Sequence, residues 1–459
     1  MKPERFDVFV IGGGGTGSEI VGRIAPVGDM RVGMAERDRL GGECSWYGCV
    51  PSKIMLRSAK IAANARRAAD FGVRIPHVDV DLAAVRARVL RIVEENTSAG
   101  AGPFTEQGAR VILDNVRVIG PNELETSAGE RIVADRIVFA SGSEAEVPPI
   151  DGLRDGPYWT NKEAIWQTGG VPSSLVVIGG GAIGVEFAQI YSRFGASVTI
   201  LESAERVLPS EDDDSCAVIR AGLEADGIDI ITGAKIVSAR HGPAGWSVAL
   251  DGSGPLDIEQ VLVATGRRPV FDGHDLESAG VSLDDNGRPI LDRTLRTTAP
   301  NIWAAGDATG ELLFTHVGGY EAKVVVDDIS DRPRERDYRV VPKVTYTDPE
   351  VASVGLGETA ARDSGYEIVT SLLRLEDNER AVLEGKPEGH VKLVADAHTG
   401  ELLGGHIVGE RAGEMIHEVV VAMAGHVPVQ TVGDAIHAYP TLSEAVQGAF
   451  DQLAEALPG

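Results

Sequence analysis

Apolar residues in this chain gather in short runs, and glycine-rich turns separate these runs from stretches with helical spacing. An apolar run at residues 6–11 leads into the turn "GGGGTG" and then into a helical pattern. The same order of strand, glycine turn and helix returns at residues 174–202. A strand followed directly by a helix predicts a parallel βαβ unit, so the pattern predicts an α/β fold with two such units.

The first glycine turn has the spacing of a dinucleotide-binding fingerprint. Gly12, Gly14 and Gly17 fit G-x-G-x-x-G, and Glu36 closes the next apolar run, "MRVGMAE". The first glycine makes a tight turn, the second lets a pyrophosphate approach, and the third lets helix and strand pack closely. The helix N-terminus binds the phosphates and the acid accepts a ribose hydroxyl. We therefore predict a dinucleotide site here.

The second glycine turn repeats this device. Gly179, Gly181 and Gly184 fit the same spacing, and Glu202 closes the following strand. An acid at this position favours a free 2′-hydroxyl, and hence NADH over NADPH. Arg206, four residues later, leaves open the alternative that a 2′-phosphate is bound. Two fingerprints predict two dinucleotides in one chain.

After about residue 335 the pattern changes. "VPKVTYTDPEVASVGLGE" and "GHVKLVADAHTGELLGGHIVG" alternate like antiparallel strands, with "HTGE" as a predicted turn. Helical patterns follow at residues 414–424 and 443–457. This α+β tail has no nucleotide signature, so we expect another role for it, such as pairing of subunits.

The charge balance excludes several classes of partner. The chain has 459 residues, of which 69 are acidic and 43 basic, and its formal net charge is −26. Such a surface repels nucleic acid and anionic membranes, so we expect neither as a partner. The apolar runs are too short to span a bilayer, and the first begins too early to leave room for a signal peptide. We therefore expect a cytoplasmic protein.

Two of the three cysteines stand five residues apart in "GGECSWYGCVPSK", residues 41–53. Cytosolic disulfides are uncommon and are usually transient and catalytic. The residues alone leave four interpretations of Cys44 and Cys49 open: unrelated core thiols, a metal site, a structural disulfide or a redox pair. A zinc site needs further ligands at suitable spacing and none stands nearby, so we predict no metal site. Cys216 is expected to be a bystander.

Taken together, these motifs resemble those of the class I pyridine nucleotide–disulfide oxidoreductases. The resemblance covers essentially the whole chain and rests on "GGGGTG" with Glu36, "GGECSWYGCVPSK", "GGGAIGVE", "ATGRRP", "NIWAAGDATG", "VPKVTYTDPEVASVG" and "HAYPTLSE". It implies a homodimeric flavoprotein enzyme that uses FAD and NAD(P)H. It also implies a glutathione reductase-like architecture with two Rossmann-like domains. The implied domains are FAD-binding at 1–150, NAD-binding at 151–268, a central domain that completes the FAD site at 269–335, and dimerisation at 336–459.

The resemblance assigns roles to individual residues. Cys49 corresponds to the thiol that touches the flavin, Cys44 to the outer thiol that exchanges with substrate, and Lys53 with Glu186 to an ion pair near the flavin. Asp307 would hold the ribityl chain. The implied FAD-binding residues are Gly12, Gly14, Gly17, Glu36, Gly42, Lys53, Ser141, Gly142, Asp307, Thr315 and His316, the last two through their backbone. The implied NAD-binding residues are Gly179, Gly181, Gly184, Glu186, Glu202 and Gly266.

Helix geometry supports a reactive cysteine pair. Five residues of an ideal α-helix rise about 7.5 Å, which exceeds the usual Cα separation in a disulfide, roughly 4.4–6.8 Å. A Cys44–Cys49 bridge therefore needs a distorted turn, which Gly48 permits. Strained disulfides are easily reduced. The following helix, expected to open at Pro51–Ser52, also favours a thiolate at its N-terminus.

The chain departs from the family at its acid–base residue. In "IHAYPTLSE", Tyr439 stands where the disulfide reductases have a catalytic histidine, while the partner glutamate, Glu444, is retained. A phenol titrates near pH ~10 and an imidazole near ~6.5, so tyrosine is a poor proton shuttle at neutral pH. We interpret His437 as a packing or surface residue. "SWY" between the cysteines suggests a different acceptor pocket.

Three functions follow from these observations. The first is electron transfer from NADH through FAD and the cysteine pair to a small acceptor, such as an unusual disulfide or a quinone. The alternative is a dihydrolipoyl dehydrogenase in which His437 or a water replaces the base. The third is a flavoprotein of low turnover that senses redox state or acts as a scaffold. Mercuric ion reduction is not expected, because no cysteine follows Cys216.

Overall fold

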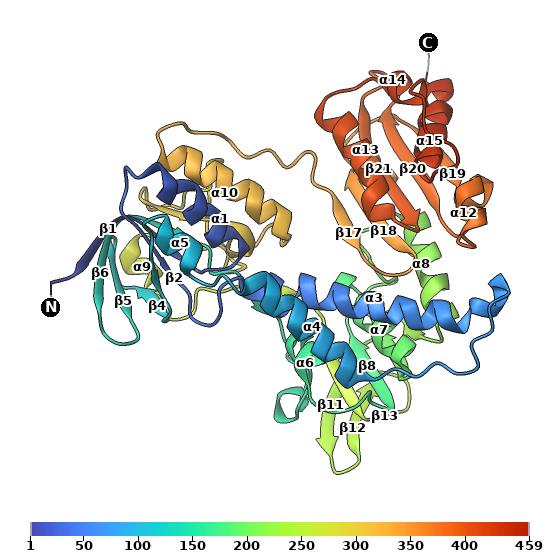
Figure 1. Cartoon of the computed structure of the whole chain (residues 1–459), viewed down its shortest axis with the longest axis horizontal. Coiled ribbons are helices and arrows are strands. Elements are labelled where there is room, and N and C mark those ends of the chain that lie inside the picture. The colour runs from blue at the N-terminus through green and yellow to red at the C-terminus, as the bar shows by residue number, and fades with distance from the viewer. Residues whose placement is uncertain (1, 458–459) are drawn as a thin grey trace. The chain divides into compact units, whose positions relative to one another are not determined.

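The computed structural model describes residues 2–457 (Figure 1). The chain folds as two compact units. Both units are assembled from segments that are far apart in the sequence. The first unit comprises Met1–Ile54, Ala84–Glu146 and Gly266–Asp337. The second comprises Met55–Ala83, Val147–Thr265 and Tyr338–Gly459. The four domain boundaries expected above stay a prediction.

The first unit is built on a seven-stranded sheet of order β3-β2-β1-β6-β5-β4, with β16 paired to β6. Its parallel part, which holds the glycine turn, consists of β1 (Glu4–Ile11), β2 (Val32–Ala35), β3 (Arg110–Ile112), β6 (Arg131–Phe139) and β16 (Ile302–Ala304). Strands β4 (Val116–Val118) and β5 (Glu123–Thr126) extend it in antiparallel fashion. Helices α1 (Gly15–Ile24) and α10 (Thr315–Ile329) lie side by side against the sheet.

The helix-to-strand fit of the first unit depends on glycine. A Cβ atom on Gly17 would lie 1.9 Å from the carbonyl oxygen of Gly12. Gly12 itself has a φ of +111°, which side-chain-bearing residues rarely adopt. The buried core between α1, α10 and the sheet includes Val10, Ile20 and Val325. The glycine spacing therefore sets how closely α1 packs on β1, as the sequence predicts.

The second unit contains the repeated fingerprint. Its parallel sheet has the order β10-β9-β8-β14 and consists of β8 (Ser174–Ile178), β9 (Ser197–Leu201), β10 (Asp229–Ile231) and β14 (Gln260–Val263). Helix α7 (Ala182–Phe194) follows β8, and a Cβ on Gly184 would lie 1.9 Å from the oxygen of Gly179. A small antiparallel sheet follows, formed by β11 (Ile236–Gly242), β12 (Gly245–Leu250) and β13 (Leu256–Ile258).

The C-terminal part of the second unit is the α+β tail. Its antiparallel sheet has the order β17-β18-β21-β20-β19, formed by β17 (Lys343–Thr345), β18 (Glu350–Gly355), β19 (Ile368–Arg374), β20 (His390–Asp396) and β21 (Leu402–Gly409). Helices α13 (Ala412–Ala424) and α15 (Ser443–Ala456) pack on it around a buried apolar cluster. The predicted "HTGE" turn does connect β20 and β21. The mixed α/β class expected from the pattern is confirmed.

Two features of the described residues concern membranes and metals. Between residues 2 and 457, none of the helices has both the length and the apolar character needed to cross a membrane. In the same range, no group of three or more histidine, cysteine, aspartate or glutamate side chains is placed to hold a metal ion.

Candidate active site

The first glycine turn and Glu36 form one hydrogen-bonded group. The Gly13 N–H donates to Glu36 Oε2 at 2.8 Å, and the Asp38 N–H donates to Glu36 Oε1 at 2.8 Å. Gly42 approaches this turn closely, since a Cβ on Gly42 would lie 2.8 Å from the Gly14 Cα. A fixed carboxylate beside an open helix N-terminus suits a ribose hydroxyl and a pyrophosphate. This part of the chain fits FAD.

A small pocket of about 50 Å³ continues from Glu36. The buried Ser141 hydroxyl, a predicted FAD residue, lines it and has no hydrogen-bond partner among the described residues. His274 also lines it, and the Val118 N–H donates to its Nδ1 at 3.0 Å. Burial and the Arg37 charge lower the pKa of His274 to about 4, so the ring is neutral at pH 7. Sequence reasoning missed Arg37 and His274, because no local motif marks them.

Asp307 lies in a chain of hydrogen bonds. The Ser143 hydroxyl donates to Asp307 Oδ2 at 2.5 Å, and Arg267 Nε donates to the Ser143 oxygen at 2.8 Å. Arg267 also pairs with Glu43, the neighbour of Cys44, at 3.1 Å. The predicted ribityl acid is thus connected to the redox segment. Ser143 and Arg267 were not predicted, because 124 residues separate them.

The redox cysteines flank a break between two helices. Cys44 lies on α2 (Gly42–Trp46), and Cys49 begins α3 (Cys49–Arg66), two residues earlier than the sequence suggested. Tyr47, with a φ of −131°, ends the first helix, so the two cysteines do not lie on one continuous helix. Both cysteines are free thiols, and Cys49 is exposed. A hydrogen bond to Cys49, reinforced by burial, raises the pKa of the Cys44 thiol.

Thr315 has a side-chain role that the sequence did not reveal. Its Oγ1 lies 3.5 Å from Cys49 Sγ. A hydrogen bond from the same side chain lowers the pKa of Cys44, opposing the larger effect of Cys49. One hydroxyl therefore serves both sulfurs. Only the backbone of Thr315 was expected to act.

We expect Thr315→Val, which keeps the shape and removes the hydroxyl, to make the thiols less acidic. The pH profile of alkylation by iodoacetamide should move upward by about one pH unit, because the thiolate loses a hydrogen-bond donor. Thr315→Ser keeps the hydroxyl and is the control. An unchanged profile in the valine variant would contradict a role for this side chain.

The second fingerprint repeats the geometry of the first. The Gly180 N–H donates to Glu202 Oε2 at 2.5 Å, and the Ala204 N–H donates to Oε1 at 2.7 Å. Arg206 forms an ion pair with the exposed Asp213. The Glu202 carboxylate is therefore held in place by backbone N–H groups, and its contact with a ribose hydroxyl stays a prediction.

This geometry predicts a change of nucleotide preference. Glu202→Gln is expected to lower the ratio of kcat/KM for NADH over NADPH by about 10-fold or more, since a charged hydrogen bond is worth ~1.5–3 kcal/mol. Steady-state rates with both nucleotides measure the ratio, in which general losses of stability cancel. The exposed Glu205→Gln is the control, and an unchanged ratio in Glu202→Gln would contradict the assignment.

Glu186, near the start of α7, is buried and accepts a hydrogen bond from the Tyr346 N–H at 2.9 Å. Its ion pair with Lys53 stays a prediction.

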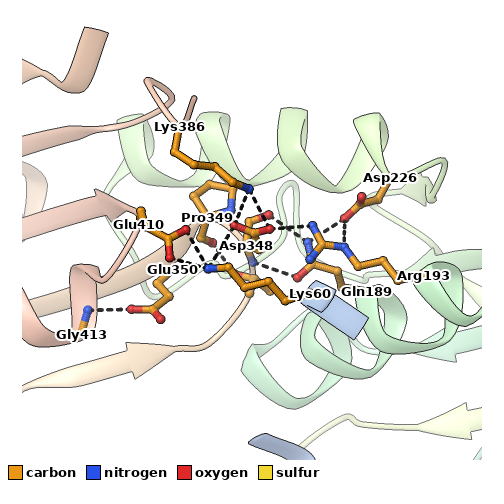
Figure 2. Close-up of polar contacts among 11 residues, drawn as sticks. Lys60, Gln189, Arg193, Asp226, Asp348, Pro349, Glu350, Lys386, Glu410 and Gly413 are labelled. Carbon is orange, nitrogen blue, oxygen red and sulfur yellow. Dashed lines mark hydrogen bonds and ion pairs between the residues drawn. The ribbon is translucent and has the colours of Figure 1, made fainter. Parts of the chain in front are cut away.

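A network around Asp348 fixes the far ends of α3 and α7 within the second unit (Figure 2). Its carboxylate lies 2.9 Å from Lys386 Nζ, 3.1 Å from Arg193 Nη2 and 3.6 Å from Lys60 Nζ. Lys60 is held in turn by Glu410 at 2.7 Å. Burial alone would raise the pKa of Asp348, but the three cations outweigh it and lower this pKa.

Asp348→Asn is expected to destabilise the protein by about 3 kcal/mol at pH 7, because it removes the carboxylate that three largely buried cations share. A lowered pKa means that the stabilisation is present above the unfolded pKa of ~3.9 and is lost as pH falls through the folded value. The difference between natural protein and variant should therefore shrink below pH ~4. Urea unfolding from pH 3 to pH 7 measures it, with the exposed Asp363→Asn as control. A pH-independent difference would contradict this account.

A phenol stands in the segment where the resembled family has its catalytic histidine. Tyr439 is 70% exposed, and its hydroxyl donates to Glu379, which raises the pKa of the phenol. Glu444 Oε2 accepts the Thr441 N–H at 2.8 Å. Tyr439 and Glu444, the two site residues expected in this segment, thus bond to Glu379 and to the Thr441 N–H.

His437 has a hydrogen-bond acceptor beside each ring nitrogen. Its Nδ1 lies 2.9 Å from the Ala435 carbonyl oxygen and its Nε2 lies 2.7 Å from Glu418 Oε1. Both neighbours only accept hydrogen bonds, so these contacts favour the form of the ring that carries hydrogen on both nitrogens. Burial lowers the pKa of His437, but these two hydrogen bonds outweigh it and raise the value. A histidine that keeps both hydrogens is a poor base.

Comparison with known proteins shows the family. The family described as pyridine nucleotide-disulphide oxidoreductase matches residues 6–322, and its dimerisation domain matches residues 341–450. The dihydrolipoyl dehydrogenase of Thermus scotoductus is 34% identical, over 98% of this chain and 97% of the relative. The mercuric reductase of Bacillus cereus is 32% identical, over 96% of this chain and 70% of the relative. The chain therefore belongs to the pyridine nucleotide-disulphide oxidoreductases.

Solved structures agree with this assignment. The HOCl-induced flavoprotein disulfide reductase RclA from Escherichia coli has a TM-score of 0.88 at 28% identity, over 97% of this chain and 99% of that one. LpdA from Mycobacterium tuberculosis has a TM-score of 0.89 at 25% identity, over 98% of this chain and 99% of that one. The expected glutathione reductase-like fold and a flavoprotein enzyme that uses FAD and NAD(P)H are thereby confirmed. The dimerisation domain fits the expected homodimer.

Proposed function

We propose that the chain passes electrons from NADH, through FAD and the Cys44/Cys49 pair, to a small acceptor such as an unusual disulfide or a quinone. The observation that carries this proposal is the hydrogen-bonded group of Cys44, Cys49 and Thr315 in the unit that holds the FAD-binding turn. The fixed acceptor Glu202 supports NADH as the donor.

Each group of site residues would have its own role in this reaction. FAD, when bound, supplies the hydride chemistry, and the protein orients it. Glu36 and the glycine turn would hold its adenosine and phosphates, and Asp307 its ribityl chain. Cys49 would exchange electrons with the flavin, Cys44 would attack the acceptor, and Thr315 would stabilise the thiolate. On the acceptor side, Tyr439 would offer a phenol, and His437 an imidazole whose contacts favour protonation.

Anaerobic reduction with NADH tests the dithiol mechanism. A long-wavelength absorption band from a thiolate beside the flavin should appear on the FAD-loaded protein. Bound flavin without such a band, at any ratio of NADH to protein, would overturn the mechanism.

The relatives favour a second candidate, a dihydrolipoyl dehydrogenase with a replaced base. The hydrogen bonds of His437 argue against this histidine as the replacement. A screen of acceptors separates the candidates and should include lipoamide, other disulfides, quinones and oxygen. Cu(II) belongs in it as well, because a structural neighbour is a Cu(II) complex of RclA. Lack of rapid NADH consumption with every acceptor would favour a sensor or scaffold.

A further inference from the structure

The start of the redox segment lies directly on the FAD-binding turn. The Gly41 N–H donates to the Gly13 carbonyl oxygen at 2.9 Å, and Gly14 pairs with Gly41 as an isolated parallel bridge. A Cβ on Gly13 would lie 2.6 Å from Leu40 Cδ2. The turn that is expected to bind phosphate and the segment that carries the thiols are therefore in close packing contact.

Trp46 and Tyr47 add a second connection. The Tyr47 hydroxyl donates to Asp38 Oδ2 at 2.8 Å, and the Trp46 Nε1 donates to the Leu40 carbonyl oxygen at 3.0 Å. The Arg39 guanidinium lies 4.5 Å from the centre of the Trp46 ring. Both aromatic side chains thus contact residues 38–40, the loop that follows the ribose acid Glu36. The sequence had suggested instead that these two side chains form part of an acceptor pocket.

The loop transmits this connection to the nucleotide site. The Asp38 N–H donates to Glu36 Oε1, so a continuous path of hydrogen bonds runs from Glu36 through Asp38 to the Tyr47 hydroxyl. Tyr47 lies in the non-helical turn between Cys44 and Cys49, so its backbone is part of the link between the two thiols. A ligand that contacts Glu36 is therefore connected to the cysteine turn through this path.

We propose that Tyr47 and Trp46 are positioning residues that couple occupancy of the ADP half of the FAD site to the dithiol–disulfide equilibrium of Cys44 and Cys49. Linkage is reciprocal, so oxidation of the pair must change the affinity of the nucleotide by the same factor. The proposal rests on FAD binding at this turn and is independent of the acceptor. Its failure is therefore distinguishable from failure of the proposed function.

The equilibrium can be set with glutathione. In this reaction the two thiols and one oxidised glutathione give the Cys44–Cys49 disulfide and two reduced glutathiones, so two electrons and two protons pass to glutathione. The full-length FAD-free protein is equilibrated with and without ADP, which lacks the flavin and so excludes direct flavin–sulfur contact. We expect ADP to shift the equilibrium constant about 5-fold or more, within the usual range of coupling. Tyr47→Phe should abolish this shift.

The holoenzyme provides an independent measurement. The dissociation constant of FAD is measured for the disulfide and the dithiol forms, and their ratio is compared between natural protein and Tyr47→Phe. Any contact of flavin with sulfur is common to both proteins, so it cancels in the comparison. The ratio should change about 5-fold in Tyr47→Phe and stay unchanged in Tyr366→Phe, an exposed tyrosine control.

Asp38→Ala tests the same path from its other end. If the Tyr47–Asp38 bond carries the coupling, combining Asp38→Ala with Tyr47→Phe should reduce the shift caused by ADP no more than either substitution alone. The proposal would be overturned if Tyr47→Phe destabilised both redox forms equally and left the ratio of the two FAD dissociation constants unchanged. Tyr47 would then have a merely structural role. A shift by ADP that persists in Tyr47→Phe, or is absent from the natural protein, would overturn it as well.

Discussion

Cys44→Ser is expected to lower the NADH-dependent reduction of a disulfide acceptor by at least ~10³-fold, the scale of loss when a catalytic nucleophile is removed. A serine hydroxyl cannot attack a disulfide, and Cys49 alone cannot release the product. The thiolate band on reduction with NADH should survive in Cys44→Ser, because Cys49 remains. The same band should be lost in Cys49→Ser. Anaerobic spectra and steady-state rates on FAD-loaded protein measure both effects.

Cys216→Ser is the matched control for these variants. The Cys216 thiol is buried and donates to the Leu208 carbonyl oxygen at 3.2 Å, and burial raises its pKa to about 11. Such a thiol is inert at neutral pH, so its removal should leave turnover unchanged.

Full turnover by Cys44→Ser would mean that electrons pass from the flavin to the acceptor without the outer thiol. That result would contradict the proposed route for the acceptor tested.

The features that the sequence predicts correctly are those that neighbouring residues determine. Gly12 and Gly17 are five positions apart, and their contact depends only on the local turn and helix. The break between α2 and α3 follows in the same way from the spacing of Cys44, Gly48 and Cys49. Residues within one turn restrict one another's geometry, so their pattern can be interpreted without knowing the rest of the fold.

The features that escaped prediction depend on long-range packing. Ser143 meets Asp307 across 164 residues, and Thr315 Oγ1 reaches Cys49 across 266 residues. No spacing rule connects such positions. Trp46 and Tyr47 show the same limit at short range, because their identities indicate an unusual environment but not the direction of their side chains. The hydrogen bonds to Asp38 and Leu40 in the folded chain determine that direction.

Tyr439→His is expected to raise lipoamide turnover by about 10²-fold or more, since positioned acid–base catalysis contributes ~10²–10⁴-fold. The natural phenol is unsuited to this role at neutral pH, because its hydrogen bond to Glu379 raises its pKa from an already high value. An imidazole titrates near pH ~6.5 and can exchange protons with the outer thiol. The pH profile of lipoamide turnover by the variant should therefore show an additional ionisation near that pH. The profile is measured with lipoamide and with its reduced form.

His437→Gln is the companion variant for this test. Gln keeps a hydrogen-bond donor for Glu418 but has no titrating group near neutral pH. If His437 is only a fixed cation, its replacement should leave the pH profile unchanged while Tyr439→His alters it. High lipoamide activity in the natural protein, or loss of that activity in Tyr439→His, would favour a dihydrolipoyl dehydrogenase with another base. In that case the acceptor side of the proposed function would have to be reassigned, while the route from NADH to the thiols would stand.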